Sequence, residues 1–263
     1  MINRIARSFI ARTQNWESKH FENTRHGKKI AMLKNKHKGG RCFIIGNGPS
    51  LTADDLECIH NSGIPSFAMN RVFNIFPQTK WRPTYYCSED ILILGPTQNI
   101  VNNMDAKMKF IPINLKWYEG VEINDAVYFM MDYHSDVKEN FNLSLDCSHS
   151  IRCRGTVTST CIQLAIYMGF SEIYLLGIDH NYAKAIDLNG NVVEDDSVKD
   201  YFMDGYDDDI KDQVVHDMRA QTMAFCDAEQ LSRKLKTFRI FNTTRGGKLE
   251  VFERINFDTL FNQ

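Results

Sequence analysis

The sequence predicts an α/β domain built on a doubly wound, mostly parallel, Rossmann-like sheet, with an N-terminal helical extension and a mobile lid. Three observations predict this fold. From residue 41 onward, short apolar and β-rich runs alternate with stretches of helical pattern. The first of these runs, CFIIG at 42–46, leads directly into a glycine turn. The chain has 263 residues, 43% of them hydrophobic, which is enough to bury such a sheet.

We divide the chain into a basic helical extension, residues 1–40, and a nucleotide-binding α/β domain, residues 41–263. The first 41 residues hold eleven Lys or Arg against two acidic residues, although the net charge of the whole chain is only −2. A basic amphipathic helix over 1–38 either rests on an anionic membrane surface or packs on its own domain or on a second subunit. The apolar residues at near-helical spacing are Ile2, Ile5, Phe9 and Trp16.

The remaining elements follow from composition and from end signals. Thr52 followed by Asp55 indicates a capping box for a helix over 53–61. The polar, acidic stretch at about 183–212 predicts a lid insertion. Further helices are expected over about 156–168 and 212–235. Further strands are expected over 64–70, 83–90, 108–114, 127–133, 172–179 and 237–244.

Composition also restricts the class of protein. The seven cysteines form no CxxC pair and lie mostly in apolar runs, which is typical of reduced thiols in a cytoplasmic protein without structural zinc. No stretch approaches the roughly 20 apolar residues that span a bilayer. Because the basic excess is confined to one end, we expect no nucleic-acid partner. We expect a cytoplasmic protein, peripheral at the inner membrane if the basic helix binds lipid.

The loop GNGPSL, residues 46–51, lies where ligands bind in such sheets, beyond the end of the first strand. Gly46 and Gly48 can take positive φ and let a ligand approach the backbone, and the next helix offers free N–H groups to a phosphate. The dinucleotide fingerprint fails at Leu51, where its third glycine belongs, and at Asn70, where a carboxylate belongs. No GKS or GKT follows. The loop therefore favours a nucleotide other than NAD, or else is a structural turn without a ligand.

Three segments together resemble the small bacterial sialyltransferases that build lipooligosaccharide. They are GNGPSL, FAMN at the end of the second strand, and GTVTSTCIQLAIYMGFSEIYLLGID at 155–179. The wider group with this pattern includes motility-accessory flagellin glycosyltransferases and 6-hydroxymethylpterin diphosphokinase. The resemblance covers about residues 41–245. It implies a glycosyltransferase that moves sialic acid or a related acidic sugar from a CMP-sugar donor, with inversion and without a metal or other cofactor, to a surface glycan such as lipooligosaccharide or capsule.

The resemblance also implies site residues. His216 matches the spacing of the catalytic histidine, with His180 as its rival, and Tyr182 lies near one of two tyrosines that hold the departing phosphate. Tyr201 and Tyr206 are candidates for the second tyrosine. The expected nucleotide-binding residues are Gly46, Asn47, Gly48, Pro49, Ser50, Asn70, Ser88, Arg154, Gly155, Thr156 and Asp179.

This sequence departs from the family pattern at several places. Cys87 and Ser88 stand where the family has a second asparagine, and Val157 and Thr158 replace a serine–glycine pair. These differences weaken the assignment of the donor but not that of the fold.

Two other groups of charged residues could take part in the chemistry. Arg152 and Arg154 could meet a sugar carboxylate or pair with acids of the lid. The acid run Asp207–Asp209 could bind a metal but is more typical of a solvated surface. Residues of DYHSD and beyond, namely Asp132, His134, Asp136 and His149, fit no standard metal site.

Two alternatives to the transferase remain open. One is a pterin-type diphosphokinase using ATP and Mg²⁺, and the other is a non-catalytic nucleotide-binding partner protein. For the transferase the partners are the CMP-sugar, a glycan or glycolipid acceptor, the membrane surface and a second copy of the chain. The sugar, acceptor and linkage are not specified by the sequence.

Overall fold

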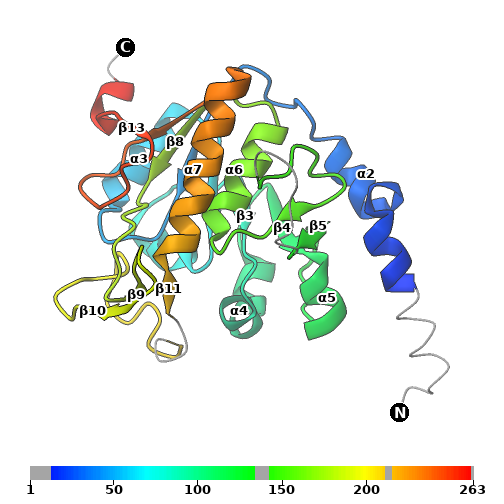
Figure 1. The fold of residues 1–263 in the computed structure, drawn as a ribbon, viewed down its shortest axis with the longest axis horizontal. Helices are drawn as coiled ribbons and strands as arrows, with labels where there is room; N and C mark the ends of the chain where they lie inside the picture. Colours follow the sequence, from blue (N-terminus) through cyan, green and yellow to red (C-terminus); the bar gives the residue numbers. More distant parts are fainter. Residues whose placement is uncertain (1–12, 134–141, 211–214, 262–263) are drawn as a thin grey trace.

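The computed structural model describes residues 13–133, 142–210 and 215–261 and confirms the α/β fold (Figure 1). Its central sheet has eight strands, and each pair of neighbouring strands runs parallel. The strand order is β13-β12-β8-β1-β2-β3-β4-β5. The strands are β1 Arg41–Ile45, β2 Ser66–Met69, β3 Tyr85–Cys87, β4 Met108–Pro112, β5 Val127–Phe129, β8 Glu172–Leu176, β12 Arg239–Asn242 and β13 Glu253–Arg254.

The order of the strands reverses beside β1. The chain runs outward from β1 to β5 on one side, then returns to pair β8 with the other edge of β1 and continues to β12 and β13. In an open parallel sheet the crevice at such a reversal, beyond the carboxyl ends of the strands, is the usual place for a ligand. The glycine loop after β1 and the GID segment after β8 both end there.

Helices cover both faces of this sheet. In Figure 1, α6 and α7 lie in front of the sheet and α3 lies behind it. Ten of the eleven residues of α6 are buried, because the helix is enclosed between the sheet and α7. The helices are α2 Arg25–Ala31, α3 Ala53–Ser62, α4 Ile91–Asn103, α5 Ile113–Glu119, α6 Val157–Tyr167 and α7 Met218–Leu235, with 3-10 turns at Phe21–Asn23, Val72–Gln78 and Phe257–Leu260.

The predicted helices and strands are confirmed in type and near position. The sequence did not predict strand β13 or any strand within the lid. Thr52 caps α3 as expected, accepting a hydrogen bond from the backbone N–H of Asp55 at 3.2 Å. The side chain of Asp55 does not complete a capping box and instead pairs with Arg245. Helices α4 and α5 were not predicted. Gly95 and Pro96 interrupt the pattern of α4, and α5 is only seven residues long.

The predicted lid contains ordered secondary structure. Strands β9 Lys184–Ile186 and β10 Val192–Glu194 form an antiparallel hairpin, and β9 also pairs in parallel with β11 His216–Asp217. This small sheet places His216 beside Ala185 at the start of α7. Residues 211–214 lie outside the described residues. A second small pair joins β6 Met131–Asp132 to β7 Ile151–Arg152.

The described part of the N-terminal extension packs on the α/β core. Phe21, Ile30 and Leu33 are buried in the same hydrophobic cluster as the sheet, and α2 lies along the β5 edge (Figure 1). Trp16 is exposed and stacks on His20. Ile2, Ile5 and Phe9 lie outside the described residues, so membrane binding by this segment stays a prediction. Within the described residues no helix has the length and apolar character needed to cross a bilayer.

We expect that deleting residues 1–38 will prevent stable folding, whereas Met32→Ala, at an exposed side chain of the same extension, will leave the melting temperature close to that of the full chain. The deletion removes Phe21, Ile30 and Leu33, and full burial of each such side chain stabilises the fold by about 1.5–3 kcal/mol. Thermal unfolding followed by circular dichroism compares the two. Equal melting temperatures for 39–263 and the full chain would contradict this packing role.

Candidate functional site

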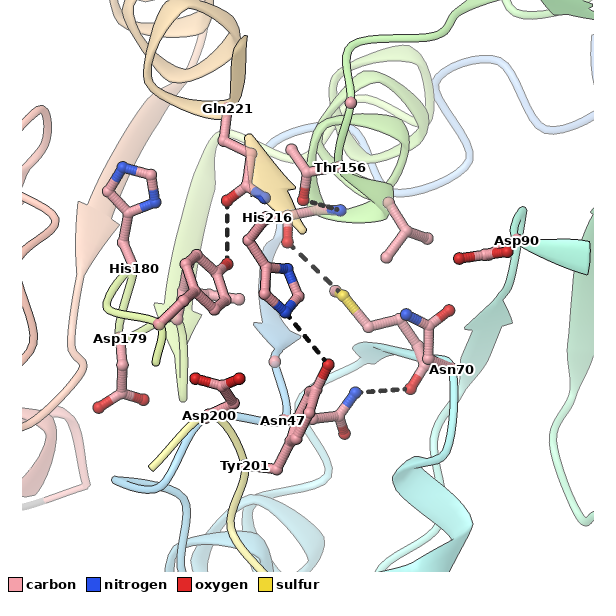
Figure 2. A pocket seen from close by; sticks show the side chains of 18 of the residues that line it. Asn47, Asn70, Asp90, Thr156, Asp179, His180, Asp200, Tyr201, His216 and Gln221 are labelled. Atoms are coloured by element: carbon pink, nitrogen blue, oxygen red, sulfur yellow. Dashed lines mark hydrogen bonds between the residues drawn. The ribbon is translucent and has the colours of Figure 1, made fainter. Parts of the chain in front are cut away.

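A cavity of about 330 Å³ lies at the reversal of strand order (Figure 2). The segments after β1, β2, β3 and β8 line it, together with the N-terminus of α6, β11 and the first turns of α7. Ten of the fourteen predicted site residues line this cavity, and their roles stay predictions. They are Gly46, Asn47, Gly48, Asn70, Gly155, Thr156, Asp179, His180, Tyr182 and His216.

The two glycines of the loop do not have the backbone conformation that the sequence predicts. Neither adopts positive φ. A Cβ on Gly46 would lie 2.3 Å from the carbonyl oxygen of Gly177, and one on Gly48 would lie 1.9 Å from Oδ2 of Asp179. The glycines therefore allow the loop after β1 to contact the GID turn after β8. Both also line the cavity, so close approach of a ligand to their backbone stays a prediction.

Pro49 and Ser50 are not among the described residues that line the cavity. Ser50 instead joins the two loops, because its Oγ donates a hydrogen bond to Oδ2 of Asp179 at 2.7 Å. Burial raises the pKa of Asp179, and the hydrogen bonds from Ser50 partly oppose that rise.

Two asparagines stand on the β1 and β2 side of the cavity (Figure 2). Asn47 donates from Nδ2 to the carbonyl oxygen of Met69 at 3.0 Å, and its buried Oδ1 has no partner among the described residues. Asn70 has φ of 52°, a left-handed conformation that is uncommon outside glycine, although asparagine adopts it more readily than most residues. Its side chain accepts a hydrogen bond from Ser88, which is itself fully buried and does not line the cavity. Ser88 therefore supports Asn70 rather than facing a ligand.

His216 lies between two tyrosines. Its ring stacks on that of Tyr182 with 3.9 Å between centroids, and its Nε2 lies 3.4 Å from the hydroxyl of Tyr201 (Figure 2). Tyr182 in turn donates to Oε1 of Gln221 on α7 at 2.9 Å. Burial lowers the pKa of His216 to about 4, so the imidazole is neutral at physiological pH and can accept a proton. Burial raises the pKa values of Tyr182 and Tyr201, so both hydroxyls stay protonated and can donate.

His180 is a second neutral imidazole at the cavity. Its Nε2 lies 2.8 Å from the hydroxyl of Thr222, while its buried Nδ1 has no partner among the described residues. Burial lowers its pKa as well. The residue has φ of 51°, so the chain turns sharply at the end of the GID segment.

The N-terminus of α6 forms another wall, as predicted for Gly155 and Thr156. Thr156 is the N-cap and accepts a hydrogen bond from the backbone N–H of Thr158 at 3.3 Å. Arg154 does not line the cavity, because its guanidinium pairs with Asp227 of α7 at 2.6 Å. Arg152 similarly pairs with Asp132 at 2.7 Å. Neither arginine is placed to meet a ligand in this cavity.

A segment of the predicted lid closes one side of the cavity. The backbone N–H of Phe202 donates to the carbonyl oxygen of Asn47 at 3.0 Å. Arg71 binds both carboxyl oxygens of Asp209, at 2.6 and 2.7 Å, and donates to the carbonyl oxygen of Tyr206 at 2.7 Å. Tyr206 stacks on Tyr201 with 4.0 Å between centroids. Of the two tyrosine candidates, Tyr201 reaches His216 and Tyr206 anchors the segment.

The sequence did not reveal the acidic character of this cavity. None of the described lining residues is a lysine or arginine, whereas five carry carboxyl groups. Each of these carboxyls accepts a hydrogen bond from a nearby group of the chain. The sequence also did not reveal Gln221, which lines the cavity and accepts a hydrogen bond from Tyr182. The carboxyl residues are Glu89, Asp90, Asp179, Asp200 and Asp217.

The described residues contain no group of three or more His, Cys, Asp or Glu side chains that could hold a metal ion. Asp209 of the acid run is bound to Arg71, and burial raises the pKa of Asp207. His134 and Asp136 lie outside the described residues. The part of the chain that the structure describes therefore contains no preformed all-protein metal site, and we derive no step through a magnesium ion.

Comparison with known proteins identifies a family. The model described as "6-hydroxymethylpterin diphosphokinase MptE-like" matches residues 15–185. No curated protein matches the sequence. Among solved structures, the chain is similar to a MAf glycosyltransferase from Magnetospirillum magneticum AMB-1, with 17% identity and a TM-score of 0.52. That match covers 89% of this chain but only 38% of the solved one. At this identity the likeness concerns the fold. The family model matches well over half of the length of this chain, and the chain therefore belongs to the MptE-like family.

Proposed function

We propose that this protein is an inverting glycosyltransferase that moves an acidic sugar, sialic acid or a relative, from a CMP-sugar to a surface-glycan acceptor. The observation that carries the proposal is the neutral imidazole of His216, held between Tyr182 and Tyr201 at the cavity. The likeness in fold to a glycosyltransferase agrees with it.

In this mechanism His216 is the general base. Its free imidazole nitrogen takes the proton of the acceptor hydroxyl while that oxygen attacks the anomeric carbon. The bond between that carbon and the phosphate oxygen breaks on the opposite face, and CMP leaves with the electron pair. General-base catalysis of this kind contributes on the order of 10²–10⁴ in rate. The low pKa belongs to the cavity without ligand, and a bound anion would raise it toward neutrality, where a base works better.

The protein offers hydrogen-bond donors, rather than cations, to the leaving phosphate. The protonated hydroxyl of Tyr201 lies 3.4 Å from Nε2 of His216, and the N-terminus of α6 faces the cavity with the positive end of its dipole. The hydroxyl of Tyr182, which donates to Gln221 in this structure, would turn to the phosphate when the donor binds. A departing monophosphate carries less charge than a departing diphosphate. We therefore propose transfer without a metal or other cofactor.

The acceptor is proposed to be a glycan or glycolipid at the inner face of the membrane. Arg25, Lys28 and Lys29 on α2 are exposed, which suits contact with an anionic surface. On this proposal the protein is cytoplasmic and peripheral to the membrane.

A second candidate is a pterin-type diphosphokinase using ATP and Mg²⁺, which the description of the matching family favours. Transfer of a diphosphate normally relies on Mg²⁺ between the phosphates. The acidic side chains at the cavity are engaged by local hydrogen bonds and do not gather into a metal site among the described residues. We prefer the transferase because of the neutral imidazole of His216 at the cavity, which suits a general base.

Thermal shift with CMP, CDP, ATP–Mg²⁺ and GTP tests these two functions. We expect CMP in EDTA to stabilise the protein selectively, by about 2.7 kcal/mol at a hundredfold excess over Kd. At roughly 2–4 °C per kcal/mol for a chain of this size, the shift is easily measured. Stabilisation by ATP–Mg²⁺ alone would overturn the transferase and favour the diphosphokinase. No response to any nucleotide would contradict both enzymes and leave the non-catalytic partner protein.

A further inference from the structure

Glu89 is a cavity residue to which the mechanism gives no task. It follows β3, and its Oε2 accepts a hydrogen bond at 2.6 Å from the hydroxyl of Thr160, which is fully buried on α6. No described residue donates to the other oxygen, Oε1, although Glu89 lines the cavity. The carboxyl group is therefore fixed on one side and free to bind a ligand on the other.

The surroundings of Glu89 favour its neutral form. Burial raises its pKa to about 7, the charge of Asp90 raises it as well, and the hydrogen bond from Thr160 acts in the opposite direction. The other titratable groups that interact with it are Cys87, Cys153 and Tyr133. Burial raises the pKa of each of these three, so they are neutral near pH 7. Among the described residues no cation is recorded as interacting with Glu89.

The proposed donor brings two negative charges into this acidic cavity, one on the phosphodiester and one on the sugar carboxylate. The phosphate can use the tyrosine hydroxyls and the N-terminus of α6. Asp179 and Asp200 already accept hydrogen bonds from Ser50 and from the backbone N–H of Ala183. A neutral carboxyl group can donate a hydrogen bond to a carboxylate, whereas an ionised one repels it.

Position agrees with this assignment. Figure 2 shows Asp90, the chain neighbour of Glu89, across the cavity from Asp179 and His180, with His216 between them. A sugar whose anomeric carbon faces His216 would thus have one side of its ring toward Glu89. We propose that Glu89 is a specificity-determining residue that donates a hydrogen bond from its carboxylic acid to the carboxylate of the acidic sugar. The inference rests on the proposed function.

The expected pH dependence follows from the direction of the shift. Below about pH 7 Glu89 is protonated and binds the sugar carboxylate, and above it the ionised side chain repels that group. Loss of one proton weakens binding by up to about tenfold for each pH unit above the pKa. Neither the phosphodiester nor the carboxylate of the donor titrates in this range, so the donor itself adds no slope.

The experiment is isothermal titration calorimetry of the full chain with CMP-N-acetylneuraminic acid at pH 6, 7, 8 and 8.5, repeated with the methyl ester of its carboxylate. We expect the ratio of the Kd of the free acid to the Kd of the ester to rise at least tenfold from pH 6 to 8.5, because uptake of a proton by His216 affects both ligands alike. Glu89→Gln should abolish this change in the ratio. Thr160→Val removes the hydrogen bond that lowers the pKa, so it should move the loss of affinity to higher pH. Asp196→Asn removes an exposed carboxyl and should behave as wild type.

The outcomes separate the two proposals. Donor binding in which the ratio of the two Kd values does not change with pH, or in which Glu89→Gln retains that change, overturns the role of Glu89 and leaves the transferase standing. An equal slope for acid and ester also overturns it, because the sugar carboxylate would then play no part. Failure of wild type to bind the donor at any pH overturns the proposed function and this inference with it. If Glu89→Gln does not fold, the direction of the Thr160→Val shift decides.

Discussion

Replacing His216 by alanine should lower the rate of sugar transfer by about 10²–10⁴-fold while CMP still binds. The neutral imidazole is stacked on Tyr182 and lies 3.4 Å from the hydroxyl of Tyr201, so its removal deletes the base without touching the glycine loop. Initial rates at saturating donor and acceptor give the loss in kcat, and calorimetry with CMP shows whether the nucleotide site is intact.

The matched control is His60→Ala, which removes an exposed histidine from the end of α3 and should keep the wild-type rate. Transfer at the wild-type rate in His216→Ala would place the base elsewhere. His180, with its unpartnered Nδ1 at the same cavity, would then be the next residue to replace.

Gly46→Ala should destabilise the fold strongly, at the upper end of the roughly 1–3 kcal/mol typical of overpacking. The new methyl group would lie 2.3 Å from a backbone oxygen of Gly177 and 2.4 Å from Cδ1 of Ile178, and the backbone atom cannot move without disturbing β8. Urea unfolding of the full chain, followed by circular dichroism, measures the change in midpoint.

Gly95→Ala is the control for this substitution. Gly95 lies inside α4, and a Cβ there meets only the flexible Cδ1 of Ile91, at 3.5 Å. Because alanine favours a helix over glycine, this variant should gain about 0.5–1 kcal/mol. An unchanged midpoint for Gly46→Ala would show that the two loops are not in close contact in solution.

The sequence was sufficient for seven of the eight strands of the central sheet, because buried parallel strands are marked by continuous apolar runs such as CFII and EIYLL. Strand β13 has only two residues, both exposed, and leaves no such run. The sequence also predicted most of the helices. It did not predict α4, because Gly95 and Pro96 are typical of a loop. Tertiary packing stabilises this helix, in which Ile93, Leu94 and Val101 are buried.

The site was predicted less completely, for a physical reason. A motif shows which residues lie near a strand end but not which partner each side chain takes. Arg154 forms an ion pair with Asp227, and Ser88 donates a hydrogen bond to Asn70. Neither lines the cavity, although both are chain neighbours of residues that do. The converse holds for Glu89, whose role depends on Thr160, a residue 71 positions later.

The place of β1 in the sheet has a consequence for synthesis of the protein. β1 pairs with β2 on one edge and with β8, which begins at Glu172, on the other. At typical translation rates, β8 leaves the ribosome on the order of ten seconds after β1, so one edge of β1 stays unpaired for that time. During that interval a strand whose last four residues are apolar has an open edge, which makes it a starting point for aggregation during overexpression.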